Sequence, residues 1–170
     1  MVRWVCVLMA ATVAFSASEA AAPESMSFDC DALPGTVSTM DANRLAPTRA
    51  ISGSLSALQS RHDSNLTPTA TVKLASRKDF VALQMTPIER NSSTFILFIR
   101  NGDNQQEERT ELGHVTLNQA VPFTIAKDGK NVRVEAAGRA VFIEQSFRGT
   151  PNVGVSCSTG HFRFDNIRFG

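Results

Sequence analysis

Three carboxylates lie close together in the middle of the chain, at Glu107, Glu108 and Glu111. Two carboxylates in one groove can cleave a glycosidic bond, one as the acid and the other as the nucleophile or base. Because side chains alternate along a strand, we expect Glu107 and Glu111 on one face and Glu108 on the other. Glycoside hydrolysis is therefore one alternative for this chain, but the spacing assigns no catalytic residue.

A second group of polar side chains is suited to binding rather than to reaction. Gln84, Arg100, Arg109, Glu111 and His114 lie in or next to segments of strand-like sequence, where a sheet would turn them toward solvent. Lectin-like sites usually add an exposed aromatic ring, but the chain has no Tyr, and its single Trp lies in the apolar run at the N-terminus. We therefore predict binding through polar and charged strand faces, with a polysaccharide as the partner.

Metal and nucleophile chemistry find little support in the sequence. The three histidines, His62, His114 and His161, are far apart, whereas a zinc site needs three or four converging ligands. No Gly-x-Ser-x-Gly motif is present to position a nucleophilic serine. Asp165 and Asn166 could donate oxygen ligands to a structural calcium ion, and bulge-stabilising hydrogen bonds explain them equally well. We expect no metal centre and no cofactor.

The N-terminus has the three parts of an export signal. Arg3 is followed by an apolar run up to Phe15 and by small residues up to about Ala22. The run is shorter than the roughly 20 residues needed to span a bilayer. We predict a signal peptide over residues 1–20, cleavage near Ala21, no later membrane insertion, and a secreted or periplasmic protein.

Two cysteines, Cys30 and Cys157, remain after this cleavage, one near each end of the mature chain. In an oxidising compartment only one intramolecular pairing is open to them, and the alternative is two free buried thiols. In the chain-entropy model such a long loop gives a disulfide worth up to about 5 kcal/mol. We predict the disulfide, which requires the first strand to lie beside the next-to-last strand.

Charge is balanced over the whole chain. It has 17 Lys and Arg against 16 Asp and Glu, a net charge of +1, and the basic residues are scattered. Nucleic acid and anionic membranes are recognised by clustered basic residues. We therefore expect neither as a partner.

The elements that must position these side chains are strands. No segment has a sustained helical stripe of apolar residues, whereas apolar residues alternate over 51–59, 69–75 and 80–85. The run Thr94–Ile99 is continuously apolar, which predicts a core strand that is covered on both faces or lies at the centre of a sandwich. About ten such short strands predict an all-β fold, a two-sheet antiparallel β-sandwich.

Turn residues divide the rest of the chain. Lys127-Asp128-Gly129-Lys130 lies between two alternating runs and predicts a hairpin, because Asp-Gly tolerates positive φ. We predict further turns at Ala137-Gly138 and Ser158-Thr159-Gly160, and a bulge at Asp165-Asn166 in the last strand. Residues 21–49 should hold a leader, the first strand and an irregular surface loop from Pro34 to Arg49, and residues 50–170 the remainder of a single domain.

Four consecutive features mark the C-terminal third: the Asp128-Gly129 hairpin, the strand Val153-Gly154-Val155-Ser156, the Ser158-Thr159-Gly160 turn, and the closing Phe162-Arg163-Phe164-Asp165-Asn166-Ile167-Arg168-Phe169. This succession resembles the concanavalin A-like lectin/glucanase jelly roll. In that superfamily the closing strand often reads apolar-Asp-Asn-apolar and pairs with the N-terminal strand, in agreement with a bridge from Cys30 to Cys157. The resemblance implies the fold and leaves the function open.

One short fragment, Arg109-Thr110-Glu111-Leu112, resembles the Arg-Ser/Thr-Glu-Leu-Arg strand of alginate-lyase-type polysaccharide lyases on the same jelly roll. There the arginine and glutamate help to bind and neutralise a uronate carboxylate. This chain has Gly113 in place of the second arginine, no Gln-Ile-His segment and no tyrosine for proton transfer. The Glu-x-Asp-x-x-Glu spacing of glycoside hydrolases on this fold is also absent. A salt-bridged, solvent-facing strand is the favoured explanation of the fragment.

These features favour a secreted or periplasmic, non-catalytic module that binds a polysaccharide or another envelope component. Two alternatives remain open. One is a polysaccharide lyase or glycoside hydrolase acting on an acidic glycan, and the other is a structural or protein-interaction sandwich without a small ligand.

Overall fold

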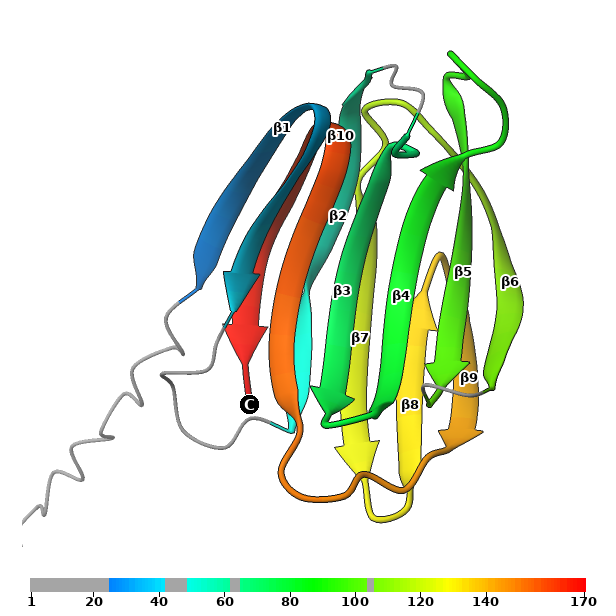
Figure 1. Ribbon diagram of the computed structural model, residues 1–170. Helices are drawn as coiled ribbons and strands as arrows, with labels where there is room; N and C mark the ends of the chain where they lie inside the picture. Colours follow the sequence, from blue (N-terminus) through cyan, green and yellow to red (C-terminus); the bar gives the residue numbers. More distant parts are fainter. Residues whose placement is uncertain (1–24, 42–48, 62–64, 104–105) are drawn as a thin grey trace, which may run out of the picture.

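The computed structural model describes residues 25–41, 49–61, 65–103 and 106–170 (Figure 1). Over these residues the chain is all-β, with ten strands and no helix, as the alternation in the sequence predicts. The predicted signal peptide lies outside the described residues. The strands are β1 (Met26–Asp41), β2 (Ala50–Ser60), β3 (Thr69–Ser76), β4 (Asp79–Pro87), β5 (Thr94–Gly102), β6 (Glu107–Thr116), β7 (Val121–Asp128), β8 (Asn131–Ala136), β9 (Arg139–Glu144) and β10 (Asn152–Phe169).

The strands form two antiparallel layers that are joined along one side (Figure 1). The front sheet contains β3, β4, β5, β6 and the first arm of β10, residues 152–158. The back sheet contains β2, β7, β8, β9 and the second arm of β10, residues 160–169. Because both arms belong to one strand, the hydrogen-bonded order β6-β5-β4-β3-β10-β2-β7-β8-β9 runs without a break. This is the predicted two-sheet sandwich.

β10 passes from one sheet to the other at Thr159, where φ is 48°. The sequence predicts a turn between two strands at residues 158–160, whereas the structure has a single strand that bends there. Gly160 permits the bend, because a Cβ atom would lie 2.8 Å from the Phe162 ring and 3.0 Å from the Gln59 carbonyl oxygen. The chain thus changes sheets while its backbone groups stay paired.

β1 bends in the same way and follows β10 through both sheets. Residues 26–32 pair with the second arm and residues 37–41 with the first, with a register shift between them. The predicted irregular loop from Pro34 to Arg49 is therefore wrong as far as Asp41, and residues 42–48 lie outside the described residues. Alternation does not reveal this arm because β1 is an edge strand whose outward side chains are mostly small or polar.

The predicted disulfide joins the two sheets beside these bends. Cys30 lies in the back-sheet arm of β1 and Cys157 in the front-sheet arm of β10, with their Cα atoms 6.0 Å apart. Both residues are buried. The strand that carries Cys157 lies beside the first strand, as predicted, because β1 pairs with β10 along both arms. It is the last strand and not the next-to-last, because β10 runs unbroken through both sheets.

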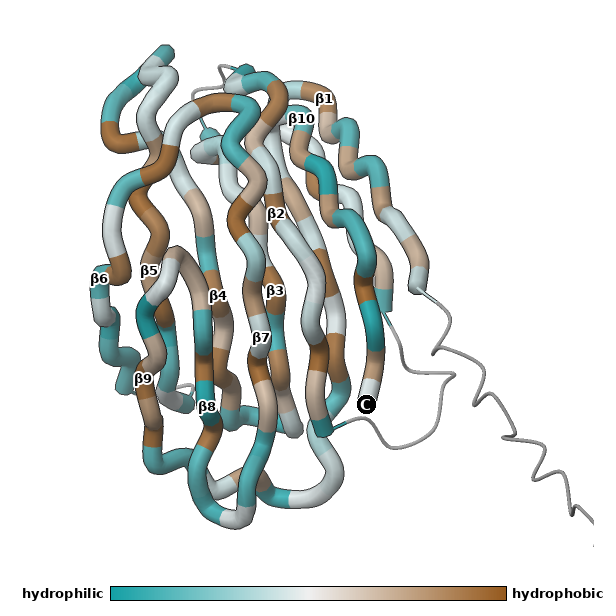
Figure 2. Tube along the Cα trace, turned by 180° about the vertical axis from the view of Figure 1, so that it is seen from behind, coloured by the Kyte–Doolittle hydropathy of each residue, from teal (hydrophilic) through white to brown (hydrophobic). Residues whose placement is uncertain are grey.

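The core lies between the sheets and consists of inward-facing aliphatic and phenylalanine side chains. Seen from behind, hydrophobic and hydrophilic positions alternate along the back-sheet strands (Figure 2). Phe95 of the front sheet and Phe162 of the back sheet meet edge to face, with ring centroids 6.2 Å apart. Burying each such side chain contributes about 1.5–3 kcal/mol, so this layer holds the two sheets together.

β5 lies within the sandwich and has a partner layer on one face only, so the alternative of cover on both faces is not realised. Phe95, Leu97 and Ile99 point into the core. Phe98 points outward, yet it is only 4% exposed. The guanidinium carbon of Arg109 lies 3.5 Å from the centroid of its ring. An arginine from the neighbouring strand therefore supplies the cover that a second layer would give.

The other predicted turns are present with one shift. The β7–β8 hairpin has Gly129-Lys130 as its two-residue loop, one residue later than predicted, and Gly129 has φ 59°. Ala137-Gly138 closes the β8–β9 hairpin with φ values of 50° and 74°. The predicted bulge is confirmed by a register shift between Asp165 and Arg168 and by φ 53° at Asn166.

Candidate functional site

A depression of about 400 Å³ lies on the outer face of the front sheet, over β3, β4 and β5 beside the first arm of β10. Two of the predicted binding residues, Gln84 and Arg100, line it. The lining is strongly basic. Its main polar side chains are Thr71, Lys73, Arg77, Lys78, Gln84 and Arg100.

Small residues form the floor of this depression. Lys73, Ala82 and Arg100 stand opposite one another on three adjacent strands. Since adjacent strands are about 4.8 Å apart, the two basic residues start roughly 10 Å apart with only a methyl group between them. Ala75 and Ser156 extend the floor toward β10. Long side chains therefore rise around a shallow base.

A ladder of side-chain hydrogen bonds crosses four strands here. The Gln84 amide donates to Thr71 Oγ1 at 3.0 Å, and Arg100 Nη1 donates to Gln84 Oε1 at 3.3 Å. Arg100 also donates to Glu107, from Nε to Oε1 at 2.5 Å and from Nη2 to Oε2. This two-pronged hydrogen bond from Arg100 holds the pKa of Glu107 below its ordinary value. The ladder fixes Arg100 and Gln84 in place without a ligand.

Phe80 gives the depression an aromatic ring, which the sequence analysis did not single out. It is half-buried, and the guanidinium carbon of Arg100 lies 5.8 Å from the ring centroid. The signal was present in the sequence: Val81, Leu83 and Met85 alternate inward, so Phe80 must face outward. The depression therefore combines a ring with amide, hydroxyl and guanidinium groups, as sugar-binding sites do.

The other three predicted binding residues lie on the edge strand β6 and do not line the depression. Arg109 stands opposite Arg100, but its guanidinium lies on Phe98. Glu111 Oε1 and His114 Nε2 lie 3.5 Å apart, and both side chains are about half exposed, 54% and 53%. The structure thus brings Gln84 and Arg100 together and places the remaining three beside them, toward solvent.

A bulge in β6 puts Glu111 and His114 on one face. On a regular strand, residues three apart would point to opposite faces. The register between β5 and β6 shifts at Leu112, and the next residue, Gly113, has φ 146°. A carboxylate and an imidazole therefore lie on the same sheet face as Arg109, outside the depression.

The three glutamates do not form a hydrolytic pair. Glu107 and Glu111 share the outer face, as predicted, whereas Glu108 accepts a hydrogen bond from buried Asn101 at 3.3 Å. Four residues along a strand span about 13 Å, more than the roughly 5–9.5 Å between the carboxyl groups of glycoside hydrolases. In addition, the Glu107 carboxylate forms an ion pair with the Arg100 guanidinium.

The β3–β4 hairpin ends the depression in a basic turn that the sequence analysis did not single out. Arg77-Lys78 form its two-residue loop, and Arg77 has φ 52°, a conformation that costs an L residue about 1–2 kcal/mol. Among the described residues, no carboxylate forms an ion pair with Lys73, Arg77 or Lys78. Asp79, a buried carboxylate in the lining, accepts a hydrogen bond from the Arg148 backbone N–H at 3.1 Å.

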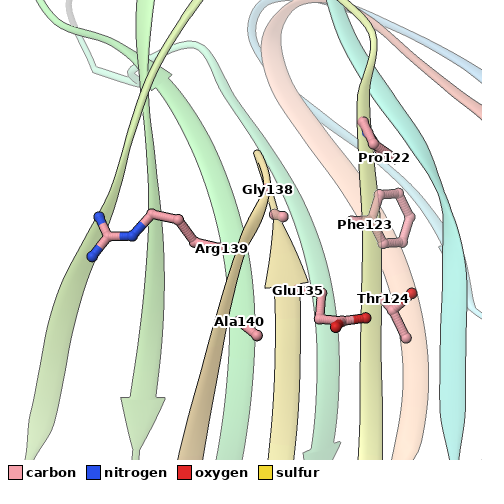
Figure 3. Close-up of a pocket in the computed structure, with 8 residues that line it drawn as sticks. Pro122, Phe123, Thr124, Glu135, Gly138, Arg139 and Ala140 are labelled. Carbon is pink, nitrogen blue, oxygen red and sulfur yellow. The ribbon is translucent and has the colours of Figure 1, made fainter.

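A second depression, of about 320 Å³, lies on the back sheet where β7, β8 and the start of β9 meet (Figure 3). Its two charged side chains already have protein partners. Glu135 pairs with Arg133, and Arg139 Nη1 donates to the carbonyl oxygens of Glu111 at 3.3 Å and Leu112 at 3.2 Å. Figure 3 shows Arg139 pointing away from Glu135. The front depression, with unpaired cations, is therefore the candidate site.

The described parts of the chain hold no group of three or more His, Cys, Asp or Glu side chains placed to bind a metal ion. His161 Nε2 lies 2.5 Å from Asp29 Oδ1, and His62 lies outside the described residues. Calcium binding at Asp165 and Asn166 stays an untested alternative to the role of these residues in the bulge. Within the described ranges, no helix is long and apolar enough to span a membrane.

Comparison with known proteins shows the fold. No protein-family model and no curated protein sequence matches this chain. Among solved structures, an alginate lyase from Klebsiella pneumoniae has a TM-score of 0.55 at 11% identity, over 72% of this chain and 59% of that one. A marine PL7 alginate lyase from Zobellia galactanivorans has a TM-score of 0.52 at 11% identity, over 72% and 61%. A double mutant of Congerin II has a TM-score of 0.50 at 14% identity, over 79% and 100%.

These similarities confirm the resemblance to the concanavalin A-like jelly roll at the level of the fold. Identities of 11% to 14% carry no information about activity. The chain spans 54% to 61% of the length of the lyases that it matches. Function must therefore be argued from the site itself.

Proposed function

We propose that this protein is an exported, non-catalytic module that binds a polysaccharide on the outer face of its front sheet. The observation that carries the proposal is the ladder from Thr71 through Gln84 to Arg100 beside the ring of Phe80. Hydroxyl, amide and guanidinium groups can bond sugar hydroxyls, and the ring can cover an apolar sugar face. Because the ladder is already ordered, binding costs less side-chain entropy.

Two features support export as part of this proposal. The predicted signal peptide over residues 1–20 would carry the chain out of the cytosol. A disulfide between Cys30 and Cys157 requires an oxidising compartment to form and persist. A secreted or periplasmic location follows.

The non-catalytic part rests on what lines the depression. Its lining contains no histidine, and its carboxylate, Asp79, is buried and hydrogen-bonded to the Arg148 backbone. Acid–base catalysis most often uses a histidine or a carboxylate within hydrogen-bonding reach of the substrate. The lining offers hydrogen bonds and positive charge instead.

Binding of the purified protein to a panel of immobilised polysaccharides tests the proposal. Arg100→Ala should weaken binding about tenfold or more, because it removes a charged donor and breaks the ladder at Gln84. Arg133→Ala is the matched control, since it removes an ion-paired arginine from the back sheet and should leave the affinity unchanged. Equal losses in both variants, or no binding by the wild type, would contradict the proposal.

A polysaccharide lyase is the second candidate, and the β6 bulge favours it by aligning Arg109, Glu111 and His114 on one face. A lyase forms unsaturated products that absorb ultraviolet light. Growing absorbance in the same incubations, lost in Glu111→Gln, would establish this function in place of the first. If the protein neither binds a polysaccharide nor produces the absorbance, a structural or protein-interaction sandwich is favoured.

A further inference from the structure

The two-residue turn at the end of the depression has an unusual occupant. Ser76 and Asp79 are paired across the β3–β4 hairpin, so Arg77 and Lys78 form its loop, with φ 52° at Arg77. The β7–β8 hairpin has the same arrangement, since its loop is Gly129-Lys130 with φ 59° at the first position. Glycine adopts this conformation readily and arginine does not. The chain thus carries an arginine where a second turn of the same molecule has glycine.

The base of this turn is held firmly by two buried polar residues. Ser76 Oγ donates to the Arg148 carbonyl oxygen at 2.7 Å, and Asp79 Oδ2 accepts from the Arg148 N–H at 3.1 Å. Ser76 and Asp79 are 5% and 6% exposed. Arg77 and Lys78 therefore extend into solvent from a fixed backbone, which reduces the entropy that a ligand must overcome.

The positive charge around the turn is only partly balanced by the protein, because Asp79 is the one carboxylate in the lining of the depression. Arg77 and Lys78 line the depression together with Lys73 and Arg100. Over the described ranges only Arg100 of these four has a carboxylate partner, Glu107. Like charges that share a surface repel one another. A ligand that brings negative charge would remove this repulsion.

We infer that Arg77 and Lys78 form an anion-recognition site, which binds a carboxylate or sulfate ester of a sugar polymer lying in the depression. The inference rests on the proposed function and adds the class of ligand and the residues that select it. Guanidinium groups bind either kind of anionic group through paired N–H···O bonds. The cost of the backbone conformation at Arg77 is already met on folding, so binding does not add to it.

Calorimetric titration of the disulfide-bonded protein at low salt tests the inference with matched polymers. Polygalacturonate is compared with its fully methyl-esterified form, and dextran sulfate with dextran. We expect the anionic member of at least one pair to bind about tenfold or more tightly than its neutral partner, and added salt to weaken it. A preference confined to polygalacturonate identifies the carboxylate, and one confined to dextran sulfate identifies the sulfate ester.

Three variants test whether Arg77 and Lys78 select the anionic polymer. Arg77→Gly and Lys78→Ser should each weaken binding of the anionic polymer about tenfold. Arg77→Gly should unfold at no lower denaturant concentration than the wild type, because glycine suits the turn. Lys130→Ser, in the corresponding turn of the back sheet, should bind like the wild type.

The failures of the two proposals are distinguishable. Equal binding of the charged and neutral polymers, or unchanged affinity in Arg77→Gly, would overturn the anion site and leave the polysaccharide-binding function standing. Absence of binding to every polymer would overturn both.

Discussion

The two sides of the sandwich are closed by different means. On one side β1 and β10 bend from sheet to sheet, and the bridge between Cys30 and Cys157 joins them. On the other side β6 and β9 are the last strands of their sheets and share no backbone pairing within the described residues. There Arg139 reaches from β9 to two carbonyl oxygens at the β6 bulge. One side is held by covalent and backbone bonds, the other by a side chain.

This difference separates stability from function. The bends of β1 and β10 cannot change conformation without leaving backbone N–H and C=O groups unpaired. The candidate depression, in contrast, lies over β3, β4 and β5, on the part of the front sheet between the closed and the open side. We therefore expect the closed side to dominate the free energy of unfolding and the open side to contribute little.

The largest effect should come from the disulfide. Replacing Cys30 and Cys157 together with alanine should lower the free energy of unfolding by about 2–5 kcal/mol, because the unfolded chain loses a constraint between residues 127 positions apart. Urea denaturation followed by circular dichroism measures this. A loss below about 1 kcal/mol would show that the two bends close this side without the bridge.

A smaller loss is expected from the aromatic pair at the closed side. Phe28 on β1 stacks on Phe164 of β10, with ring centroids 5.9 Å apart. Phe28→Ala should cost about 2 kcal/mol, less than for a fully buried ring because Phe28 is half-buried. Phe142→Ala is the control from the open side, where the ring is 69% exposed, and should cost under about 0.5 kcal/mol. Equal losses would remove the distinction between the two sides.

Arg139→Ala should lower the free energy of unfolding by about 1 kcal/mol. Two carbonyl oxygens at the β6 bulge lose their charged donor and are left to water. Amide hydrogen exchange should accelerate in β6 and β9 and stay unchanged in β1. Arg139→Lys should restore part of the protection, since lysine can reach one carbonyl. Faster exchange in β1 than in β6 would contradict the expectation that the closed side is the more stable of the two.

Acid should weaken both sides slightly. A hydrogen bond from Arg61 holds the pKa of Asp31 below its ordinary value at the closed side, as Arg100 does for Glu107 nearer the open side. Each carboxylate is therefore stabilising above its unfolded pKa of about 4, and this contribution is lost as the pH falls through the lower folded value. The effect should be small because both groups are exposed.

Urea denaturation between about pH 6 and pH 2 measures this pH dependence. The double variant Asp31→Asn, Glu107→Gln should show a shallower loss of stability than the wild type over that range. An unchanged slope would show that these two pairs do not stabilise the fold.

Much of the fold follows from the sequence. Alternation locates β2, β3 and β4 to within two residues. Gly129 and Gly138 mark the β7–β8 and β8–β9 hairpins, because the chain there has positive φ. The arm of β1 at residues 37–41 is missed, because an edge strand needs no apolar face. The cover of Phe98 is also missed, since it depends on which side chain of β6 lies opposite.

The site was predicted less completely than the fold. Gln84 and Arg100 follow from the facing of their strands and are joined in the structure. Arg109, Glu111 and His114 were assigned to the same surface, but the bulge and the ring of Phe98 determine where they point. Their binding role stays a prediction. Arg77 and Lys78 were not identified, because they lie in a turn and alternation describes only strands.

The sequence by itself determined the class of fold, the partners of the two cysteines and the facing of most strand residues, since these depend on local alternation and on the number of cysteines. Only the tertiary structure decided how the sheets are joined, which charges are neutralised and which remain unpaired. Those properties arise from side chains far apart in the chain, such as Arg100 with Glu107 and Arg139 with the β6 bulge. Their pairing depends on strand order and on single-residue shifts in register, which alternation along one strand does not record.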